Sequence, residues 1–323
     1  DGTVTVVATG ASSPYTYTWN TSPIQTNAMA TNLPQGSYTV TVTDVNTCVS
    51  STNVNITQPA ILSASLNATN VTCNGANDGT ISITASAGGY GTYEYSINGG
   101  STWQSSGAYS NVANGTYNVQ MRDAAHTACI VTLNGTLMIT QPTVLSANIN
   151  ATNVTCNGAN DGSISITSPA GGYGTYQYSI NGGGTWQNTG SYTGLANSTY
   201  NVQIRDAATL CTITLNGALN ITQPAALSAN VTPTNVTCNG ANDGTISITT
   251  PTGGYGTYEY SIDGGATWSS TGTFIGLANG TYNVQIRDAA HTACVMVLDT
   301  ALDITEPAPL SANLAFANVT CNG

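Results

Sequence analysis

The sequence predicts an all-β protein built from tandem small domains, and two observations support this. A ten-residue phrase, Asn-Val-Thr-Cys-Asn-Gly-Ala-Asn-Asp-Gly, occurs at 70–79 and recurs unchanged at 153–162 and 235–244. Between the copies, short runs alternate apolar with polar residues, and no stretch combines helical periodicity with caps. The copies lie 83 and 82 residues apart, which is enough chain for one small β domain and too much for one rung of a solenoid.

Proline pairs divide the chain into units. Gln-Pro or Glu-Pro stands at 58–59, 141–142, 223–224 and 306–307. Because proline cannot continue a ladder and restrains the residue before it, each pair predicts an extended boundary, and linkers this short favour an extended rod. The predicted domains are 1–59, 60–142, 143–224 and 225–307, called repeats 1 to 4 below, with 308–323 as the first strand of a next repeat. Repeat 1 starts without a first strand, as expected for a sequence that begins inside a repeat.

Within a repeat, the pattern predicts an immunoglobulin-like sandwich of about seven short strands. Tyr93, Tyr95 and Ile97 alternate with polar residues in repeat 2, so this strand buries one face. Hairpin signals follow, in which Asn or Asp precedes two glycines, at 98–100, 181–183 and 263–265. A Gly-x-Tyr segment resembles the tyrosine corner of such sandwiches; it occurs at Tyr38, Tyr117 and Tyr282, and repeat 3 has Ser198 in place of the glycine.

Charged residues are few and mostly acidic. Only 5% of the 323 residues are charged, against about 25% in an ordinary globular domain, and the net charge is −11. Three basic residues argue against nucleic acid as a partner, and the absence of lysine excludes lysine-based isopeptide cross-links. Arg122, Arg205 and Arg287 occupy one equivalent position, which predicts a local structural role. No apolar run approaches the roughly eighteen residues of a membrane span.

Eight cysteines fall into two series. Cys73, Cys156, Cys238 and Cys321 close the Val-Thr-Cys phrase, and Cys48, Cys129, Cys211 and Cys294 follow the late Tyr-x-Val strand. Two regularly placed cysteines per repeat predict disulfides and an oxidising, extracellular location. Bridging needs Cα atoms within about 7 Å, and the sequence leaves open whether Cys73 pairs with Cys129 in its own repeat or with Cys211 across a junction. The pair within one repeat is favoured, because such a repeat is autonomous.

These motifs in combination resemble one family. The phrase Val-Thr-Cys-Asn-Gly-x-x-Asp-Gly is followed by Tyr-x-Tyr-Ser, Leu-x-x-Gly-x-Tyr-x-Val, an Asp before a Cys, and a closing Thr-Gln-Pro. Over all four units the chain resembles the SprB repeat of very large surface adhesins of gliding Bacteroidota. The resemblance implies a cell-surface filament that is exported by the type IX secretion system and serves adhesion and gliding motility. It does not identify the ligand.

Two groups of polar side chains raise a metal hypothesis. The first is a histidine three residues before a cysteine, a spacing that zinc ligands can use. It occurs at His126 with Cys129 and at His291 with Cys294. Repeats 1 and 3 lack the histidine, so we expect exposed loop histidines and no zinc site. The second group is Asn74, Asn77 and Asp78, whose oxygens could face calcium; calcium sites gather more carboxylates than this, so an Asn/Gly turn is expected.

Each hairpin is followed closely by a tryptophan. Trp103, Trp186 and Trp268 could offer a stacking surface to sugar rings, although packing over the hairpin is the favoured use. Trp19 aligns with Ile97, an inward-facing strand position. The sequence therefore leaves a low-ranked glycan site at three tryptophans.

The leading functional hypothesis is a structural shaft segment of a long extracellular adhesin fibre, which gives reach, stiffness and surface attachment. We expect no enzyme activity and no cofactor, because acidic residues are scattered and no serine has a partnered base. The alternatives are an array of carbohydrate-binding modules and accessory domains of a secreted enzyme. Expected partners are neighbouring repeats, other copies of the fibre, since sheet edges lack protective lysine, and surface polysaccharide.

Overall fold

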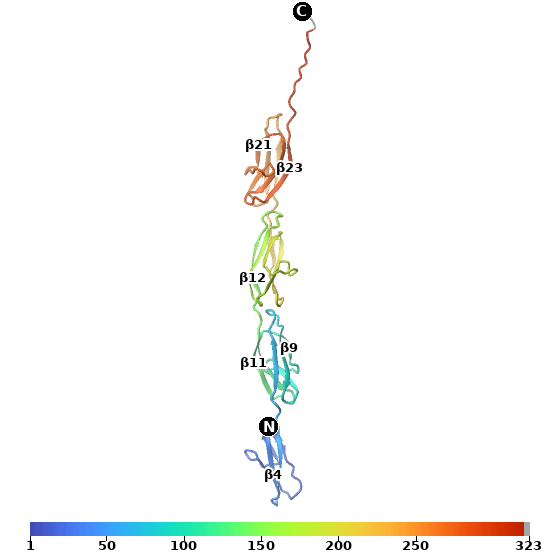
Figure 1. The fold of residues 1–323 in the computed structure, drawn as a ribbon, viewed down its shortest axis with the longest axis vertical. Coiled ribbons are helices and arrows are strands. Elements are labelled where there is room, and N and C mark those ends of the chain that lie inside the picture. Colours follow the sequence, from blue (N-terminus) through green and yellow to red (C-terminus); the bar gives the residue numbers. More distant parts are fainter. Residues whose placement is uncertain (320–323) are drawn as a thin grey trace. The chain divides into compact units, whose positions relative to one another are not determined.

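The computed structural model describes residues 1–319, and it contains strands and loops throughout that range. No helix in this part of the chain is long and apolar enough to cross a membrane. The all-β prediction and the tandem sandwiches are thus confirmed. The chain divides into two compact units, Asp1–Gln141 and the part that begins at Pro142 (Figure 1).

The first unit contains repeats 1 and 2. The strands of repeat 1 are β1 (Gly2–Thr5), β2 (Thr16–Trp19), β3 (Met29–Leu33), β4 (Gly36–Thr43) and β5 (Val49–Ile56). The strands of repeat 2 are β6 (Ser63–Thr69), β7 (Gly79–Ala87), β8 (Tyr93–Ser96), β9 (Ala108–Val112), β10 (Gly115–Asp123) and β11 (Ile130–Ile139).

The second unit contains repeats 3 and 4. The strands of repeat 3 are β12 (Ser146–Thr152), β13 (Gly162–Ala170), β14 (Tyr176–Ser179), β15 (Ser191–Leu195), β16 (Ser198–Asp206) and β17 (Thr212–Ile221). The strands of repeat 4 are β18 (Ser228–Thr234), β19 (Gly244–Thr252), β20 (Tyr258–Ser261), β21 (Thr273–Leu277), β22 (Gly280–Asp288) and β23 (Val295–Ile304).

Repeats 2 to 4 share one topology of two three-stranded antiparallel sheets. In repeat 2 the orders are β6-β7-β9 and β11-β10-β8. Repeats 3 and 4 reproduce both orders with β12 to β17 and β18 to β23. In the described part of repeat 1, β1 pairs with β3 alone, and the second sheet is β2-β4-β5.

The strand count corrects the expected seven strands to six. The hairpin after β8 folds as predicted, with Gly99 and Gly100 at φ of 68° and 86°. Its turn is held by Asn98, whose Oδ1 accepts a hydrogen bond from the Thr102 N–H at 3.0 Å. The returning chain then makes only a single bridge from Gln104 to Tyr95. One expected strand is therefore shortened to a bridge.

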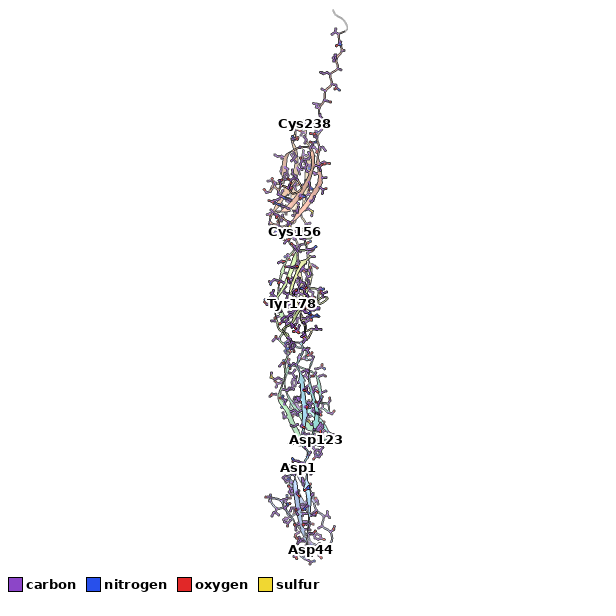
Figure 2. The ribbon with its side chains drawn as sticks, viewed as in Figure 1. Asp1, Asp44, Asp123, Cys156, Tyr178 and Cys238 are labelled. Carbon is purple, nitrogen blue, oxygen red and sulfur yellow. A yellow bond between two sulfur atoms is a disulfide. The ribbon has the colours of Figure 1, made fainter. Side chains whose placement is uncertain are left out.

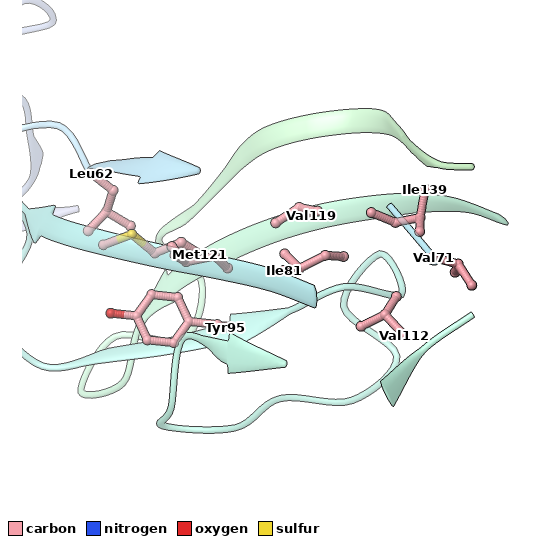
Figure 3. Close-up of a cluster of buried hydrophobic side chains, with 9 residues drawn as sticks. Leu62, Val71, Ile81, Tyr95, Val112, Val119, Met121 and Ile139 are labelled. Carbon is pink, nitrogen blue, oxygen red and sulfur yellow. The ribbon is translucent and has the colours of Figure 1, made fainter. Parts of the chain in front are cut away.

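Each repeat has its own core between its two sheets. In repeat 2, alternate residues of the strands meet there, among them Ile81, Val119 and Met121, all fully buried (Figure 3). In repeat 1, Trp19 is buried with Leu33 and Val40, which confirms its inward position. The alternation of apolar and polar residues thus placed these core positions correctly. The predicted one-sided burial of the strand at 93–97 is wrong, because the polar Ser96 is buried together with Tyr95.

The tyrosine corner is confirmed in all four repeats. The hydroxyl of each tyrosine donates a hydrogen bond to the carbonyl four residues earlier, as in immunoglobulin-like sandwiches. The pairs are Tyr38 with Pro34 at 3.0 Å, Tyr117 with Ala113 at 2.9 Å, Tyr200 with Ala196 at 3.0 Å and Tyr282 with Ala278 at 3.0 Å. Repeat 3 forms the corner although Ser198 replaces the glycine, so the tyrosine and the carbonyl are sufficient.

Candidate functional site

The repeated ten-residue phrase forms a loop between the first and second strands of a repeat, called the cysteine loop below (70–79, 153–162 and 235–244). In repeat 3 its start lies beside the end of β17. The Asn153 Oδ1 accepts a hydrogen bond from the Thr222 N–H at 2.9 Å, and the Val154 N–H donates to the Thr222 carbonyl at 2.9 Å. Val154 is buried in the core. The loop is therefore anchored where the chain leaves the repeat.

An aspartate closes each cysteine loop on itself. In repeat 3 the Thr155 N–H donates to Asp161 Oδ1 at 2.8 Å, and the Thr155 hydroxyl donates to Asp161 Oδ2. These two bonds hold the pKa of Asp161 below its ordinary value, with the hydroxyl bond the stronger cause. Asp78 makes the same contacts with Thr72. Both oxygens of the aspartate that a calcium ion would need as a ligand therefore already accept hydrogen bonds from the threonine of the same loop.

The Gln-Pro and Glu-Pro pairs contact the cysteine loop as well as marking boundaries. The Gly158 N–H donates to Gln223 Oε1 at 2.9 Å, and the Gly240 N–H donates to Glu306 Oε2 at 2.8 Å. Asn157 Nδ2 also donates to the Pro224 carbonyl at 3.1 Å. Hydrogen bonds thus join the last residues of a repeat to its cysteine loop, and they hold the cysteine in a defined position.

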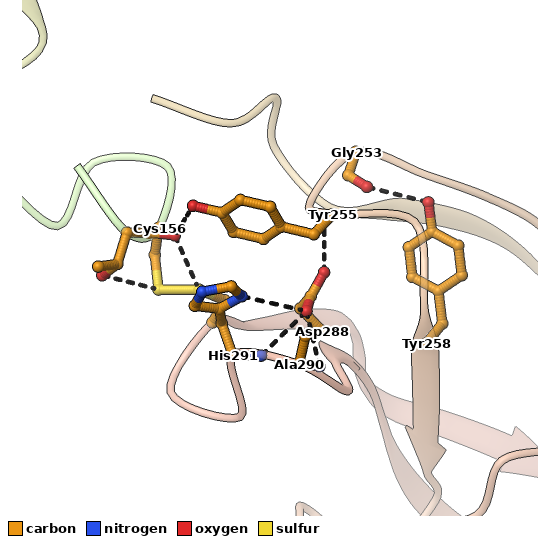
Figure 4. A network of polar contacts seen from close by, with 9 residues as sticks. Cys156, Gly253, Tyr255, Tyr258, Asp288, Ala290 and His291 are labelled. Carbon is orange, nitrogen blue, oxygen red and sulfur yellow. Dashed lines mark hydrogen bonds and ion pairs between the residues drawn. A yellow bond between two sulfur atoms is a disulfide. The ribbon is translucent and has the colours of Figure 1, made fainter. Parts of the chain in front are cut away.

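The opposite end of repeat 4 carries a group of side chains, called the receiving face below: Tyr255, Asp288, His291 and Cys294. The rings of Tyr255 and His291 are stacked, with centroids 4.0 Å apart (Figure 4). Asp288 is fully buried beneath them. It accepts hydrogen bonds from the N–H groups of Tyr255 at 2.6 Å, Ala290 at 2.9 Å and His291 at 3.0 Å. One carboxylate therefore fixes both loops of the face.

Asp288 is ionised at neutral pH despite its burial. Burial alone would raise its pKa, but the N–H donors outweigh that effect and hold the pKa below the ordinary value. His291 Nδ1 lies 3.6 Å from Asp288 Oδ1, so a protonated imidazole would add an attraction. The buried charge organises the face through backbone bonds.

A disulfide joins the cysteine loop of repeat 3 to the receiving face of repeat 4. Cys156 is bonded to Cys294, with Cα atoms 5.2 Å apart. The Tyr255 hydroxyl donates a hydrogen bond to the Thr155 carbonyl at 3.2 Å, next to the bridge (Figure 4). Cys156 also packs against the core of repeat 4. Successive repeats of this unit are thus linked by a covalent bond, a hydrogen bond and an apolar contact.

The expected pairing within one repeat is wrong. Cys129 and Cys238, which that pairing would have bridged to Cys73 and Cys294, are exposed free thiols, and so is Cys48. The physical reason is distance, because the two cysteines of a repeat lie at its two ends. In Figure 2, Cys156 marks one end of repeat 4 and Cys238 the other.

The remaining predicted cysteines are placed as follows. Neither Cys73 nor Cys211 is a free thiol. Cys321 lies outside the described residues. Among the eight candidate cysteines, Cys156 and Cys294 form the described disulfide.

The two histidines lie in loops of the receiving faces, and their side chains are 51% exposed at His126 and 40% exposed at His291. His126 stacks on Tyr90 with centroids 3.9 Å apart, as His291 does on Tyr255. The sulfur of Cys294 is in a disulfide, so it cannot act as a thiolate ligand. Within residues 1–319, no three His, Cys, Asp or Glu side chains gather in a way that could hold a metal ion.

The three tryptophans are each paired with an arginine. The guanidinium carbon lies over the ring, at 4.4 Å for Arg122 on Trp103, 4.4 Å for Arg205 on Trp186 and 4.3 Å for Arg287 on Trp268. Arg122 also forms an ion pair with Glu94 at 2.7 Å. The predicted structural role of the arginines is confirmed. One face of each partly buried ring is covered, which leaves less surface for a sugar.

The tyrosine of the receiving face was missed in the sequence, although a signal for it exists. Gly-Gly-Tyr-Gly recurs at 88–91, 171–174 and 253–256. Its first two glycines have positive φ in every copy, for example 84° at Gly253 and 56° at Gly254. A recurring tyrosine in a glycine loop indicates a contact, because neither core packing nor turn geometry requires it.

Comparison with known proteins gives one family. No curated protein matches the chain. The S-layer protein rSbsC(31-844) aligns with a TM-score of 0.19 and 12% identity, over 92% of this chain and 51% of that one, so the chain spans about half its length. A TM-score this low carries no argument. The model of the SprB repeat matches residues 1–23, 65–102, 148–185 and 230–267, one segment in each of the four repeats. The chain is therefore a SprB-repeat protein.

Proposed function

We propose that this chain is a shaft segment of a long extracellular adhesin fibre, in which its repeats supply reach, stiffness and surface attachment. The observation that carries the proposal is the Cys156–Cys294 bridge between repeats 3 and 4. A covalent link between successive domains is of little use to a module that only binds a ligand. It is useful to a chain that bears tension, because load passes through the bridge.

The bridge would shield a long stretch of chain from extension. Its cysteines are 138 residues apart in sequence. Pulled from its ends, an oxidised chain cannot extend this stretch in full, since the sulfur bond bypasses it. A fully extended chain spans about 3.3 Å per residue, so reduction should release up to about 450 Å of additional length.

Single-molecule force spectroscopy on the full chain tests this proposal. We expect extension to increase by that length when a phosphine reductant is added. A Cys129→Ser variant is the matched control, because Cys129 is a free thiol and its loss should change nothing. Equal extension of the oxidised and reduced chains would contradict a load-bearing role.

The family and the cysteine usage support a cell-surface or extracellular location for this shaft. Export by the type IX system and a part in gliding motility belong to the same proposal and rest on the family resemblance. Electron microscopy of native cells provides the direct test. Thin filaments with an axial repeat of one domain length are expected, whereas short particles attached to another folded body would favour accessory domains of a secreted enzyme.

We also propose that the segment has no catalytic role, and that its partners are neighbouring repeats and other fibres. The sugar-binding alternative remains a prediction for Trp103, Trp186 and Trp268. Their partial burial beneath arginine speaks against it. A shift of tryptophan fluorescence on adding surface polysaccharide would revive that alternative.

A further inference from the structure

Repeat 3 differs from its neighbours in the charge on the outer face of its second sheet. Repeats 2 and 4 each pair the arginine that covers their tryptophan with a glutamate on the adjacent strand. The distances from Nη2 to Oε2 are 2.7 Å for Arg122–Glu94 and 2.6 Å for Arg287–Glu259. In repeat 3 the same positions hold Arg205 of β16 and Gln177 of β14. Gln177 is neutral, and Arg205 forms no ion pair within residues 1–319.

A network of side-chain amides fixes which groups this surface offers. Arg205 Nε–H donates to Gln177 Oε1 at 2.8 Å. Because a guanidinium has donors only, Gln177 presents its oxygen to Arg205 and its Nε2 to Asn188, whose Oδ1 accepts a hydrogen bond at 3.0 Å. The acceptor oxygens of the network are thus engaged internally. The groups left over are donors, namely the Nη groups of Arg205 and the Nδ2 group of Asn188, which have no acceptor within the described part of the chain.

The donors are accessible and held on a rigid support. Asn188 is exposed and Arg205 is half-buried. The guanidinium carbon lies 4.4 Å from the ring centroid of Trp186, and Gln177 and Arg205 are ladder partners on two neighbouring strands. Packing on the ring and the bond through Nε hold the planar fork in one orientation, so little side-chain entropy is lost when a ligand binds.

Two sequence differences distinguish repeat 3 from repeats 2 and 4 at this surface. Gln177 stands where both neighbours have a glutamate. Asn188 stands where they have Ser105 and Ser270. The first difference removes a carboxylate from the guanidinium, and the second adds an amide that accepts from Gln177 and offers a donor outward. The two differences therefore act together on one surface.

The leftover donors define the chemistry of a ligand. A carboxylate matches the planar fork of Arg205, and a carboxylate is what repeats 2 and 4 place on the equivalent guanidinium. The amide of Asn188 needs a second acceptor nearby, such as a hydroxyl or a ring oxygen. A sugar acid carries both on one rigid ring, whereas an acidic protein side chain carries the carboxylate alone. Because the chain has a net charge of −11, a glycan with isolated acidic units fits it better than a polymer that is charged at every unit.

We propose that repeat 3 binds a carboxylated sugar, a uronic acid within a largely neutral glycan. Arg205 holds the carboxylate, and Asn188 holds a neighbouring oxygen of the same ring. Trp186 supports the guanidinium and does not stack on the sugar, since Arg205 covers that face of the indole. The site therefore differs from the sugar platforms considered for all three tryptophans. Binding at this site goes beyond the shaft proposal and does not rest on it.

A nuclear magnetic resonance titration of the full chain with methyl glucuronide tests the site. The four tryptophans give four indole N–H signals, and a Trp186→Phe variant identifies the signal of repeat 3. We expect a saturable shift of that signal and no such shift of the other three. Methyl glucoside is the matched control, because it has a hydroxymethyl group in place of the carboxylate, and it should bind at least about tenfold more weakly. No saturable shift with the glucuronide, or an equal shift with the glucoside, would overturn the proposal.

Two variants test the roles of the residues. Gln177→Glu restores the ion pair of repeats 2 and 4, and it should weaken binding at least about tenfold, since an internal carboxylate then occupies Arg205. Glu94→Gln with Ser105→Asn transfers the network to repeat 2, so the Trp103 signal should shift as well. Both variants keep the fold, because each introduces residues that a neighbouring repeat already carries. Unchanged binding by Gln177→Glu would overturn the role of Arg205, and equally tight binding of N-acetylglutamate amide would overturn the assignment to a sugar.

Discussion

Repeats 2 and 4 carry the same receiving face in two states. In repeat 4 the face holds a neighbouring loop, since Cys294 is bonded to Cys156. In repeat 2 the equivalent Cys129 is a free, exposed thiol. The ring stack hardly differs: its centroids are 4.0 Å apart at 26° in repeat 4 and 3.9 Å apart at 27° in repeat 2.

The hydrogen bonds to the buried aspartate are also nearly identical in repeats 2 and 4. Asp123 accepts hydrogen bonds from the Tyr90, Ala125 and His126 N–H groups at 2.6, 2.9 and 2.9 Å. Asp288 accepts the equivalent three at 2.6, 2.9 and 3.0 Å. The face is therefore organised by its own repeat before any loop is bound. Pre-organisation lowers the entropy cost of docking, so the disulfide locks a geometry that already exists.

Removing the disulfide of repeat 4 should cause the largest loss of stability relative to repeat 2. A Cys156→Ser, Cys294→Ser variant loses the constraint on its unfolded chain, which we expect to lower the free energy of unfolding of repeats 3 and 4 by about 2 to 4 kcal/mol. Differential scanning calorimetry should show their transition at a lower temperature. Cys129→Ser is the matched control in repeat 2. If both variants melt alike, the bridge is not a stabilising link.

Removing the buried aspartate should have the next largest effect. Asp288→Ala leaves three N–H donors without an acceptor, and we expect repeat 4 to lose about 2 to 3 kcal/mol of stability. Asp123→Ala should lower the transition of repeat 2 by a comparable number of degrees, because the carboxylate acts within its own repeat. Calorimetry of both variants checks this. A much smaller effect at Asp123 would mean that the bound loop, and not the repeat, organises the face.

The outline of the molecule was predictable from sequence because it depends on local patterns. Alternation in β10 predicted which of its side chains are buried, and Gly-x-Tyr predicted the corner at Tyr117. In β8 the alternation failed, because the polar Ser96 is buried beside Tyr95. The shortened seventh strand could not be predicted, since a hairpin signal at 98–100 does not show how far the returning chain pairs. Local chemistry gives the turn, whereas the length of a ladder depends on the neighbouring sheet.

The site was only half predictable. Regular spacing identified Cys156 and Cys294 as disulfide candidates, but their pairing depends on which ends of two domains meet. The buried state of Asp288 was also hidden, because its partners are backbone N–H groups that any sequence supplies. Contacts between repeats leave their trace in sequence only as recurrence, such as the tyrosine at 255.

Removing one hydroxyl should give a smaller, selective effect. Tyr255→Phe abolishes the hydrogen bond to the Thr155 carbonyl that holds the cysteine loop beside Cys294. A bond of about 0.5 to 1 kcal/mol corresponds to a two- to fivefold shift of the bridge toward its reduced form in a glutathione buffer. Alkylation and mass spectrometry of the Cys156 peptide measure this. Tyr90→Phe should leave the bridge unchanged, and an equal shift in that variant would contradict a direct contact.

The smallest predicted effect is a difference between repeats 2 and 4 in how the stability of the hairpin depends on pH. Asp263 in repeat 4 stands where repeat 2 has Asn98, and the Thr267 hydroxyl and N–H with the Ser261 hydroxyl lower its pKa from 3.8 to about 2. A carboxyl whose pKa is lower in the folded state stabilises the fold above about pH 4 and loses that contribution as the pH falls toward 2.

Because Asp263 is exposed, solvent screening limits the effect to a few tenths of a kcal/mol. We therefore expect repeat 4 of the wild type to melt slightly above that of Asp263→Asn at pH 6, and the difference to vanish at pH 2. Circular dichroism melts at both values measure this, and Asn98→Asp should transfer the dependence to repeat 2. A difference that persists at pH 2 would show that the amide, and not the charge, distinguishes the two hairpins.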